Sequence, residues 1–309
     1  MEQVTPHVYS LHVQIDWFPQ PFPPNVHLVI DRESNEGALI DAGFPDDVSI
    51  KGRLAMLKEF PGLNLRYIVI THHHFDHSSG AGKLRDETGA RIVMHELEEP
   101  VLQRAASEDM PSDMDVPAER KEWHEVTLQW RKEAAKSGAD ELVSDGDVLQ
   151  VGGLTLRMVH SPGHTVGHIS PFLEQGSVLF AGDNVLGMGT TVVPPPPHGD
   201  MVQYVESLKK MQSLNAEVMC CGHGPVVTEP NRKMQELIDH RREREEQILS
   251  LVGEGKGTVK ALVRAIYPEL DKRIMGMATS QVLSHLSKLE REGRVRTEGE
   301  GEETRVVVG

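Results

Sequence analysis

Histidines and an aspartate gather in one short segment of the chain, where residues 71–77 read THHHFDH. Alternate residues of an extended chain point the same way, so His72 and His74 can bind one ion together. Asp76 and His77 then turn toward a second point a few ångströms away. Imidazole and carboxylate ligands without a thiolate are typical of zinc in an open catalytic site rather than a closed structural one. The segment therefore predicts a catalytic metal site.

Three more candidate ligands occur later in the chain, each directly after a glycine that permits a tight turn. They are His164, Asp183 and His223. Each follows an apolar run that predicts a buried strand. We therefore expect the polar chemistry to lie where strands end.

The strands that must position these residues are short, apolar and rich in β-branched side chains, which is typical of buried strands. We predict them at residues 27–30, 38–40, 67–70, 92–94, 154–159, 178–180 and 218–221. Helices are predicted at residues 47–58, 118–136 and 201–211. The second of these lies in an insertion at residues 96–139 and carries Trp123 and Trp130 on about the same face. Two interpretations stay open: the tryptophans anchor the helix on the core, or the insertion covers the site as a lid.

The chain after Pro230 has a different pattern. Helices are predicted at residues 231–252, 258–266 and 278–293, followed by two strands at 294–297 and 304–308, which is the element order of a winged-helix module. The turn between the two strands is acidic and would repel a phosphate backbone. We predict a domain of residues 1–230 and a C-terminal winged-helix-like domain of residues 231–309, which packs or dimerises in preference to reading nucleic acid.

Composition excludes several classes of protein. The 309 residues carry a net charge of −15, and residues 1–230 alone carry −16, which disfavours nucleic acid and anionic membranes as main partners. The two cysteines, Cys220 and Cys221, are adjacent and fit a reducing compartment. The chain has no apolar stretch near the ~20 residues that a membrane span needs and no secretory pattern at its start. We expect a cytoplasmic protein that does not bind membranes.

The ordered set of candidate ligands resembles the metal-binding motifs of the metallo-β-lactamase superfamily over residues 7–228. The residues that carry the resemblance are His72, His74, Asp76, His77, His164, Asp183 and His223. An aspartate at position 183, rather than a cysteine, is similar to hydrolases of the glyoxalase II and tRNase Z kind. Asp41 matches an early aspartate that usually orients the site without touching metal.

The resemblance implies an α+β fold, an αββα metallo-β-lactamase sandwich with a small C-terminal winged-helix domain. That pairing, with the stretch at residues 182–191, is similar to the β-lactamase-like protein 2 group of the superfamily. The insertion at residues 96–139 departs from that group.

The resemblance also implies a site for two divalent metal ions, with Zn²⁺ favoured and Fe or Mn as alternatives. His72, His74 and His164 would hold the first ion. Asp76, His77 and His223 would hold the second, and Asp183 would bridge the two. A hydroxide shared by two cations suits hydrolysis, and Asp76 is the candidate catalytic residue that accepts or steers the proton.

We therefore predict a dinuclear metallo-hydrolase that cleaves a small carboxylic ester, thioester or lactone. His198, in the loop before the helix at 201–211, is a candidate substrate contact, and a homodimer is a candidate assembly. One alternative is a single-strand endoribonuclease with the same site, but cleavage of RNA needs a basic track that the acidic domain does not offer. A nucleic-acid-binding regulator with a vestigial site and an iron redox enzyme are further alternatives.

Overall fold

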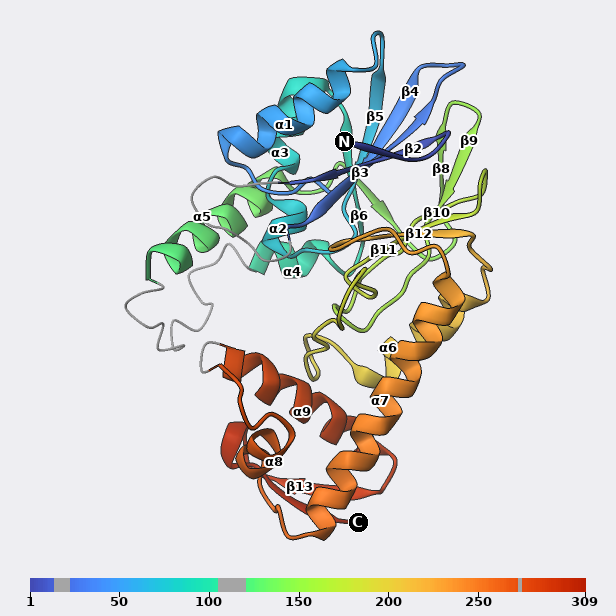
Figure 1. Cartoon of the computed structure of the whole chain (residues 1–309). Coiled ribbons are helices and arrows are strands. Elements are labelled where there is room, and N and C mark those ends of the chain that lie inside the picture. The colour runs from blue at the N-terminus through green and yellow to red at the C-terminus, as the bar shows by residue number, and fades with distance from the viewer. Residues whose placement is uncertain (14–22, 105–120, 272–273) are drawn as a thin grey trace. The chain divides into compact units, whose positions relative to one another are not determined.

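The computed structural model of the chain describes residues 1–13, 23–104, 121–271 and 274–309 (Figure 1). Its contacts divide into two compact units, which are described separately. The first unit comprises Met1–His160, Gly167–Gly189 and Ala216–Glu229. The second comprises Ser161–Val166, Thr190–Asn215 and Pro230–Gly309. The second unit therefore contains short segments from the middle of the chain as well as its C-terminal part.

A seven-stranded mixed sheet forms one half of the first unit, with strands in chain order. They are β1 (Glu2–Thr5), β2 (Val8–His12), β3 (Asn25–Asp31), β4 (Glu36–Ile40), β5 (Asn64–Val69), β6 (Arg91–His95) and β7 (Glu141–Val143). The first four strands are antiparallel, and β4 to β7 run parallel. The parallel half brings the carboxyl ends of β4, β5 and β6 to one edge.

A second sheet of five strands has the order β12-β11-β10-β9-β8. Its strands are β8 (Val148–Val151), β9 (Leu154–Arg157), β10 (Phe172–Leu173), β11 (Val178–Gly182) and β12 (Val218–Cys221). Val69 of the first sheet and Phe180 of the second belong to one buried apolar cluster, so the two sheets share a core. β11 and β12 are parallel, which places their carboxyl ends side by side.

Helices cover the other face of the first sheet (Figure 1). They are α1 (Asp47–Lys58), α2 (Phe75–Ser78), α3 (Ala81–Thr88), α4 (Glu99–Arg104) and α5 (Lys121–Ser137). Trp130 of α5 is buried, and its ring centroid lies 5.2 Å from that of Phe44. This packing supports the interpretation that Trp130 anchors the helix, whereas residues 105–120 of the insertion and the Trp123 side chain lie outside the described residues.

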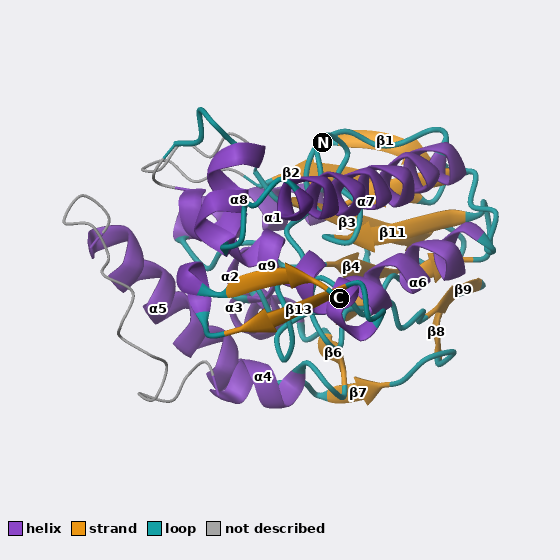
Figure 2. Ribbon diagram, turned by 90° about the horizontal axis from the view of Figure 1, so that it is seen from below, coloured by secondary structure: helices purple, strands orange, loops and turns teal. Residues whose placement is uncertain are grey.

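The second unit contains α6 (Met201–Gln212), α7 (Pro230–Gly253), α8 (Val259–Ile266), α9 (Met275–Arg291), β13 (Val295–Glu298) and β14 (Arg305–Val308). The last two strands form an antiparallel hairpin (Figure 2). The Thr258 side chain accepts a hydrogen bond from the Ala261 amide and so caps α8. Val263 and Leu286 belong to the apolar cluster of these helices and the hairpin. Helices α7, α8 and α9 and the hairpin thus form the winged-helix domain that the sequence predicts.

Across the described parts of the chain, none of the helices combines the length and apolar character that crossing a membrane requires.

Candidate metal centre

The motif at residues 71–77 changes from extended chain to helix within a few residues. β5 ends at Val69, and α2 begins at Phe75. The amide of His77 donates to the carbonyl of His74 at 3.0 Å, which closes the first turn of α2. His72 is buried in the extended part, whereas Asp76 and His77 lie on the helical turn. This change of backbone lets one short motif present ligands at two neighbouring points.

Four side chains from three segments converge at one of these points. The Nε2 atoms of His77 and His223 are 3.2 Å apart. Asp76 Oδ2 lies 3.8 Å from His77 Nε2 and 3.4 Å from His223 Nε2. Asp183 Oδ1 and Oδ2 lie 3.4 Å and 3.5 Å from the same two nitrogens. The arrangement yields two groups that could hold an ion, one of Asp76, His77 and His223 and one of His72, His77 and Asp183.

Neighbouring parallel strands position Asp183 and His223. Gly182 ends β11, and the Gly222 amide after β12 donates to the Gly182 carbonyl at 2.8 Å. A Cβ atom at position 222 would lie only 2.2 Å from Asp183 Oδ1 and 2.9 Å from His77 Cε1. Glycine is needed at position 222 because any side chain would enter the space where the ligands meet.

Asp41, directly after β4, orients His77. Its Oδ2 lies 2.8 Å from His77 Nδ1, and its Oδ1 accepts the Thr71 amide at 2.8 Å. Such a bond fixes the ring and directs the other nitrogen, Nε2, toward the cluster. The Asp41 backbone has a positive φ of 63°, so the residue occupies a sharp turn at the edge of the sheet.

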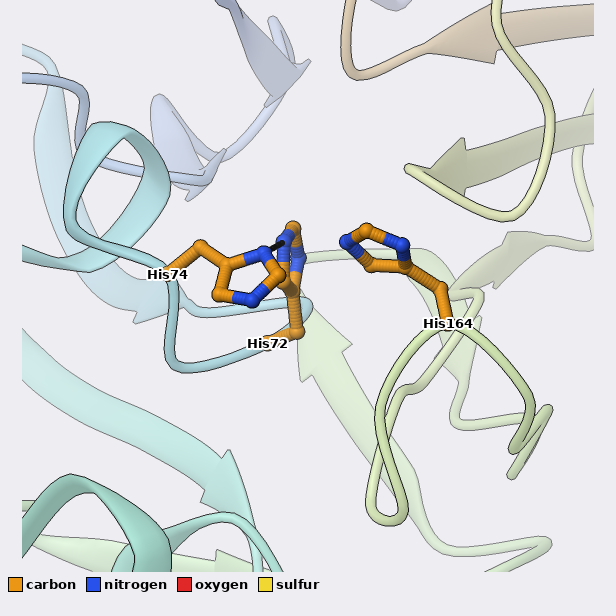
Figure 3. Close-up of side chains that lie close together, drawn as sticks. All are labelled: His72, His74 and His164. Carbon is orange, nitrogen blue, oxygen red and sulfur yellow. Dashed lines mark hydrogen bonds between the residues drawn. The ribbon is translucent and has the colours of Figure 1, made fainter. Parts of the chain in front are cut away.

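His72 and His74 form the other part of the site. His72 Nε2 and His74 Nδ1 are 3.0 Å apart, and the dashed line in Figure 3 joins these two atoms. Thr71 Oγ1 lies 3.0 Å from His72 Nδ1, and this contact fixes the orientation of the ring. The two imidazoles therefore offer a pair of nitrogens for a first ion.

His164 and His198 belong to the second unit. His164 Nδ1 lies 2.6 Å from the Val192 carbonyl, which assigns the ring proton to Nδ1 and a lone pair to Nε2. His198 is exposed in the loop at residues 190–200, and its role as a substrate contact stays a prediction.

Charge around the cluster favours a cation. Burial raises the pKa of the Asp76 carboxyl, but His77 and His223 outweigh burial and the pKa is lowered. Burial lowers the pKa of the His77 imidazole, yet Asp183, Asp41 and Asp76 raise it well above its ordinary value. The pKa of His223 is raised in the same way, because Asp183 and Asp76 outweigh burial. The carboxylates thus stabilise positive charge at this point.

The donor set fits divalent metal ions. Imidazole nitrogens and carboxylate oxygens suit Zn²⁺ as well as Fe and Mn. A cation between the Nε2 atoms of His77 and His223 would satisfy both lone pairs and be balanced by Asp76 and Asp183. The space that Gly222 provides is part of this fit.

Glu98 is a functional candidate that the sequence did not reveal. It is fully buried, and its carboxylate accepts the amides of His73 and Gly167, each at 2.8 Å. It also pairs with His73 Nδ1. Glu98 therefore ties the loop after β5 to a distant segment. Within HELEE, local sequence does not separate it from the acidic residues beside it.

His168 is a second supporting residue. Its Nε2 accepts the amide of Asp183 at 3.2 Å, and its Nδ1 lies 3.2 Å from the Asn184 side-chain amide. A Cβ atom at Gly182 would lie 2.5 Å from the same Nε2. The ring thus packs against the backbone that positions Asp183.

Comparison with known proteins identifies both domains. The model of the Metallo-beta-lactamase superfamily matches residues 19–223, and that of the Beta-lactamase associated winged helix domain matches residues 258–303. Beta-lactamase-like protein 2 homolog from Caenorhabditis elegans is 30% identical over 258 residues, 83% of this chain and 76% of that protein. Atrochrysone carboxyl ACP thioesterase from Aspergillus fumigatus is 35% identical over 144 residues, 43% of this chain and 44% of that protein.

Solved structures show the same architecture. A metallo-beta-lactamase family protein from Thermus thermophilus superimposes with a TM-score of 0.76 and 26% identity, over 99% of this chain and 100% of that one. A beta-lactamase domain protein from Burkholderia ambifaria gives a TM-score of 0.80 at 21% identity, over 100% of this chain and 93% of that one. The predicted fold is therefore confirmed.

Proposed function

The chain belongs to the metallo-β-lactamase superfamily of hydrolases, and from this membership and the geometry of its site we propose that it cleaves the carbonyl–sulfur bond of a small thioester with two divalent metal ions. The convergence of Asp76, His77, Asp183 and His223 carries the proposal. Carboxylic esters and lactones react at the same kind of carbonyl carbon and are the next candidates.

We assign Asp76, His77 and His223 to one ion, and His72, His74 and His164 to the other. The ligand atoms of Asp76, His77 and His223, all within the first unit, lie within 4.8 Å of one another, whereas His164 enters this assignment through its place in the ordered motif. Asp183 would be the ligand shared by the two ions, because it forms a third group with His72 and His77. Zn²⁺ is the favoured metal, and Fe or Mn fit the same donors.

Bound ions would lower the pKa of a coordinated water and polarise the scissile carbonyl. The protein's own groups handle the proton and hold the ligands. Asp76, whose carboxyl pKa is lowered, is ionised and can accept or steer the proton of the attacking water. Asp41 holds His77 by its Nδ1, and Glu98 holds the backbone at His73. These bonds keep the ligands in place before the substrate arrives.

Two observations support a thioester over a phosphodiester. Some similar fungal proteins are named thioesterases. Residues 1–230 carry a net charge of −16, which disfavours the approach of a polyanion. A single-strand endoribonuclease remains the alternative.

The proposal is tested by a substrate panel on zinc-loaded protein. The panel contains acyl N-acetylcysteamine thioesters, the matched oxygen esters, a lactone and labelled single-stranded RNA. We expect the parent protein to release free thiol. Asp183→Ala should lose this activity by about a hundredfold or more, because removing a proposed ligand should cost at least as much as removing a residue that supports a ligand, which costs ~10–100-fold. RNA cleavage that Asp76→Ala abolishes, with no thiol release, would replace thioester hydrolysis by the endoribonuclease alternative.

Several expectations from the sequence stay proposals alongside this one. They are the domain boundary at residue 230, the homodimer, the cytoplasmic location and the substrate contact at His198. His198→Ala in the same panel tests the proposed substrate contact, because losing such a contact should raise KM for the thioester.

A further inference from the structure

The imidazole of His164 is held by the loop at residues 190–200. Its Nδ1 lies 2.6 Å from the Val192 carbonyl and 3.2 Å from Thr191 Oγ1. A neutral imidazole that donates through Nδ1 presents the lone pair of Nε2 in one fixed direction. The position of this loop therefore determines where His164 points.

The winged-helix domain in turn holds that loop. Arg241 Nη2, from α7, donates to the Thr191 carbonyl at 2.8 Å. Gln281 Oε1, from α9, accepts the Val193 amide at 3.1 Å. Ser284 Oγ, one turn further along α9, donates to the Pro194 carbonyl at 3.3 Å. Side chains of two helices therefore bind the backbone on both sides of Val192, whose carbonyl contacts His164.

Arg241 is the central member of this arrangement. Only 2% of its surface is exposed, and its guanidinium lies 5.1 Å from the ring centroid of Tyr204 on α6. A cation over an aromatic face is stabilised in a buried site. Arg241 is therefore fixed in place and can act as a rigid support for Thr191.

The same helix α6 also supports the chain just before His164. Ser207 Oγ donates to the Pro162 carbonyl at 2.7 Å, and the Asp200 amide donates to the Gly163 carbonyl at 2.9 Å. A Cβ atom at Gly163 would lie 2.5 Å from Tyr204 Cα, so the chain passes directly over the helix. Both the ring and the backbone of His164 are thus held by parts of the second unit.

We propose that the winged-helix domain supports the candidate metal ligand His164, and that Arg241 is a positioning residue that fixes the direction in which His164 presents Nε2 to an ion. The inference rests on the proposed function insofar as His164 is taken to be a ligand. It gives the appended domain a role in metal binding that requires no nucleic acid. Loss of Arg241 should weaken binding of the ion about 10–100-fold, the range seen when groups behind a ligand are removed.

The test compares Arg241→Met with Lys288→Met in the full chain. Both changes remove a cation of the second unit, but the Nζ of Lys288 contacts Glu245 and Glu292. Zn²⁺ affinity is measured against a chelator, bound metal by mass spectrometry, and the ligand field from the visible spectrum of the Co²⁺ form. Thermal unfolding of each protein shows how much stability it has lost.

We expect Arg241→Met to lose affinity for one ion and to change the Co²⁺ spectrum as His164→Ala does. Lys288→Met should keep the Zn²⁺ affinity and the Co²⁺ spectrum of the parent, even if it loses as much stability as Arg241→Met. Arg241→Lys should recover part of the affinity, because an ammonium can still donate to the Thr191 carbonyl. Gln281→Ala should give the same change on a smaller scale. It replaces Arg241→Met in the test if that variant does not fold.

Two results would overturn the inference in different ways. If folded Arg241→Met and Gln281→Ala bind both ions like the parent while His164→Ala loses one, the positioning role is wrong and the ligand assignment stands. If His164→Ala also binds both ions unchanged, the ligand assignment itself falls, and the inference with it. A parent protein that binds two ions but cleaves nothing in the panel would contradict the proposed reaction and leave the positioning role supported.

Discussion

Two histidines of the proposed metal centre are held in the same way but by different kinds of partner. Each ring is fixed through Nδ1, His77 by the Asp41 carboxylate at 2.8 Å and His164 by the Val192 carbonyl at 2.6 Å. Asp41 lies at the end of a strand in the same sheet that leads to His77. Val192 lies in a loop that takes its position from Arg241 and Gln281, far along the chain.

The two histidines differ in the kind of group that fixes the ring. A charged acceptor makes a stronger hydrogen bond and increases the basicity of the ring that it holds. A neutral carbonyl lacks that advantage, so the geometry of its own segment matters more. The orientation of His77 is therefore set by local sheet geometry, whereas that of His164 depends on contacts between segments that are distant in sequence.

The largest effect should come from removing the negative charge of Asp41 beside His77. Asp41→Asn keeps an oxygen that can accept the Thr71 amide but removes the charge facing His77. We expect Zn²⁺ affinity and kcat for a thioester to fall about 10–100-fold. Measurement is by chelator competition and thiol release. Asp31→Asn is the matched control, because Asp31 is a buried carboxylate at the end of β3 that accepts hydrogen bonds from Ser34, Glu33 and Gly153. Equal affinities for Asp41→Asn and the parent would show that charge adds nothing to the support of His77.

A smaller effect should follow from Glu98→Gln. An amide oxygen can still accept from His73 or Gly167, but the charged acceptor for His73 Nδ1 is lost. We expect about a tenfold loss of metal affinity, the lower end of the range for supporting residues. The neighbouring Glu99→Gln should have no effect, because the Glu99 carboxylate contacts Gln103 and the Ala139 amide instead. Equal losses in both variants would indicate a general effect of charge rather than the bonds of Glu98.

How far the sequence predicted the structure depends on the range of the interactions. The helix expected at residues 47–58 and the strand at 218–221 match α1 and β12 at both ends. Local patterns suffice there, since Asp46 caps α1 and a continuous apolar run fills β12. Short strands such as β8 and β10 were not expected, because β8 alternates between exposed and buried residues and β10 has only two residues. Their pairing partners define them rather than their own composition.

The same limit applies to the site. Ligand candidates follow strands, so their spacing in the sequence was informative. Arg241 lies on a helix crowded with charge, a pattern that is typical of a solvated face, yet it is buried against a segment fifty residues earlier. Glu98 likewise acts through Gly167, which is 69 residues away. No local pattern distinguishes these residues from their charged neighbours, because their roles arise only when the chain folds.

A stability measurement compares the two units through one buried histidine in each. Burial lowers the pKa of His27 in β3 and of His285 in α9 to about 4, from the ordinary 6.5. The unfolded chain therefore takes up protons between pH 6.5 and 4 that the folded chain refuses, so the free energy of unfolding falls as the pH drops through this window. Each histidine should cost about 2 kcal/mol between pH 7 and pH 5.

Urea unfolding of the parent and of His285→Gln at the two pH values measures this cost. The variant should lose less stability on acidification, and the difference should appear in the transition of the second unit if the units unfold separately. His198→Gln, at an exposed position, should behave like the parent. If His285→Gln loses as much stability as the parent between pH 7 and pH 5, His285 does not carry the acid sensitivity of the winged-helix domain.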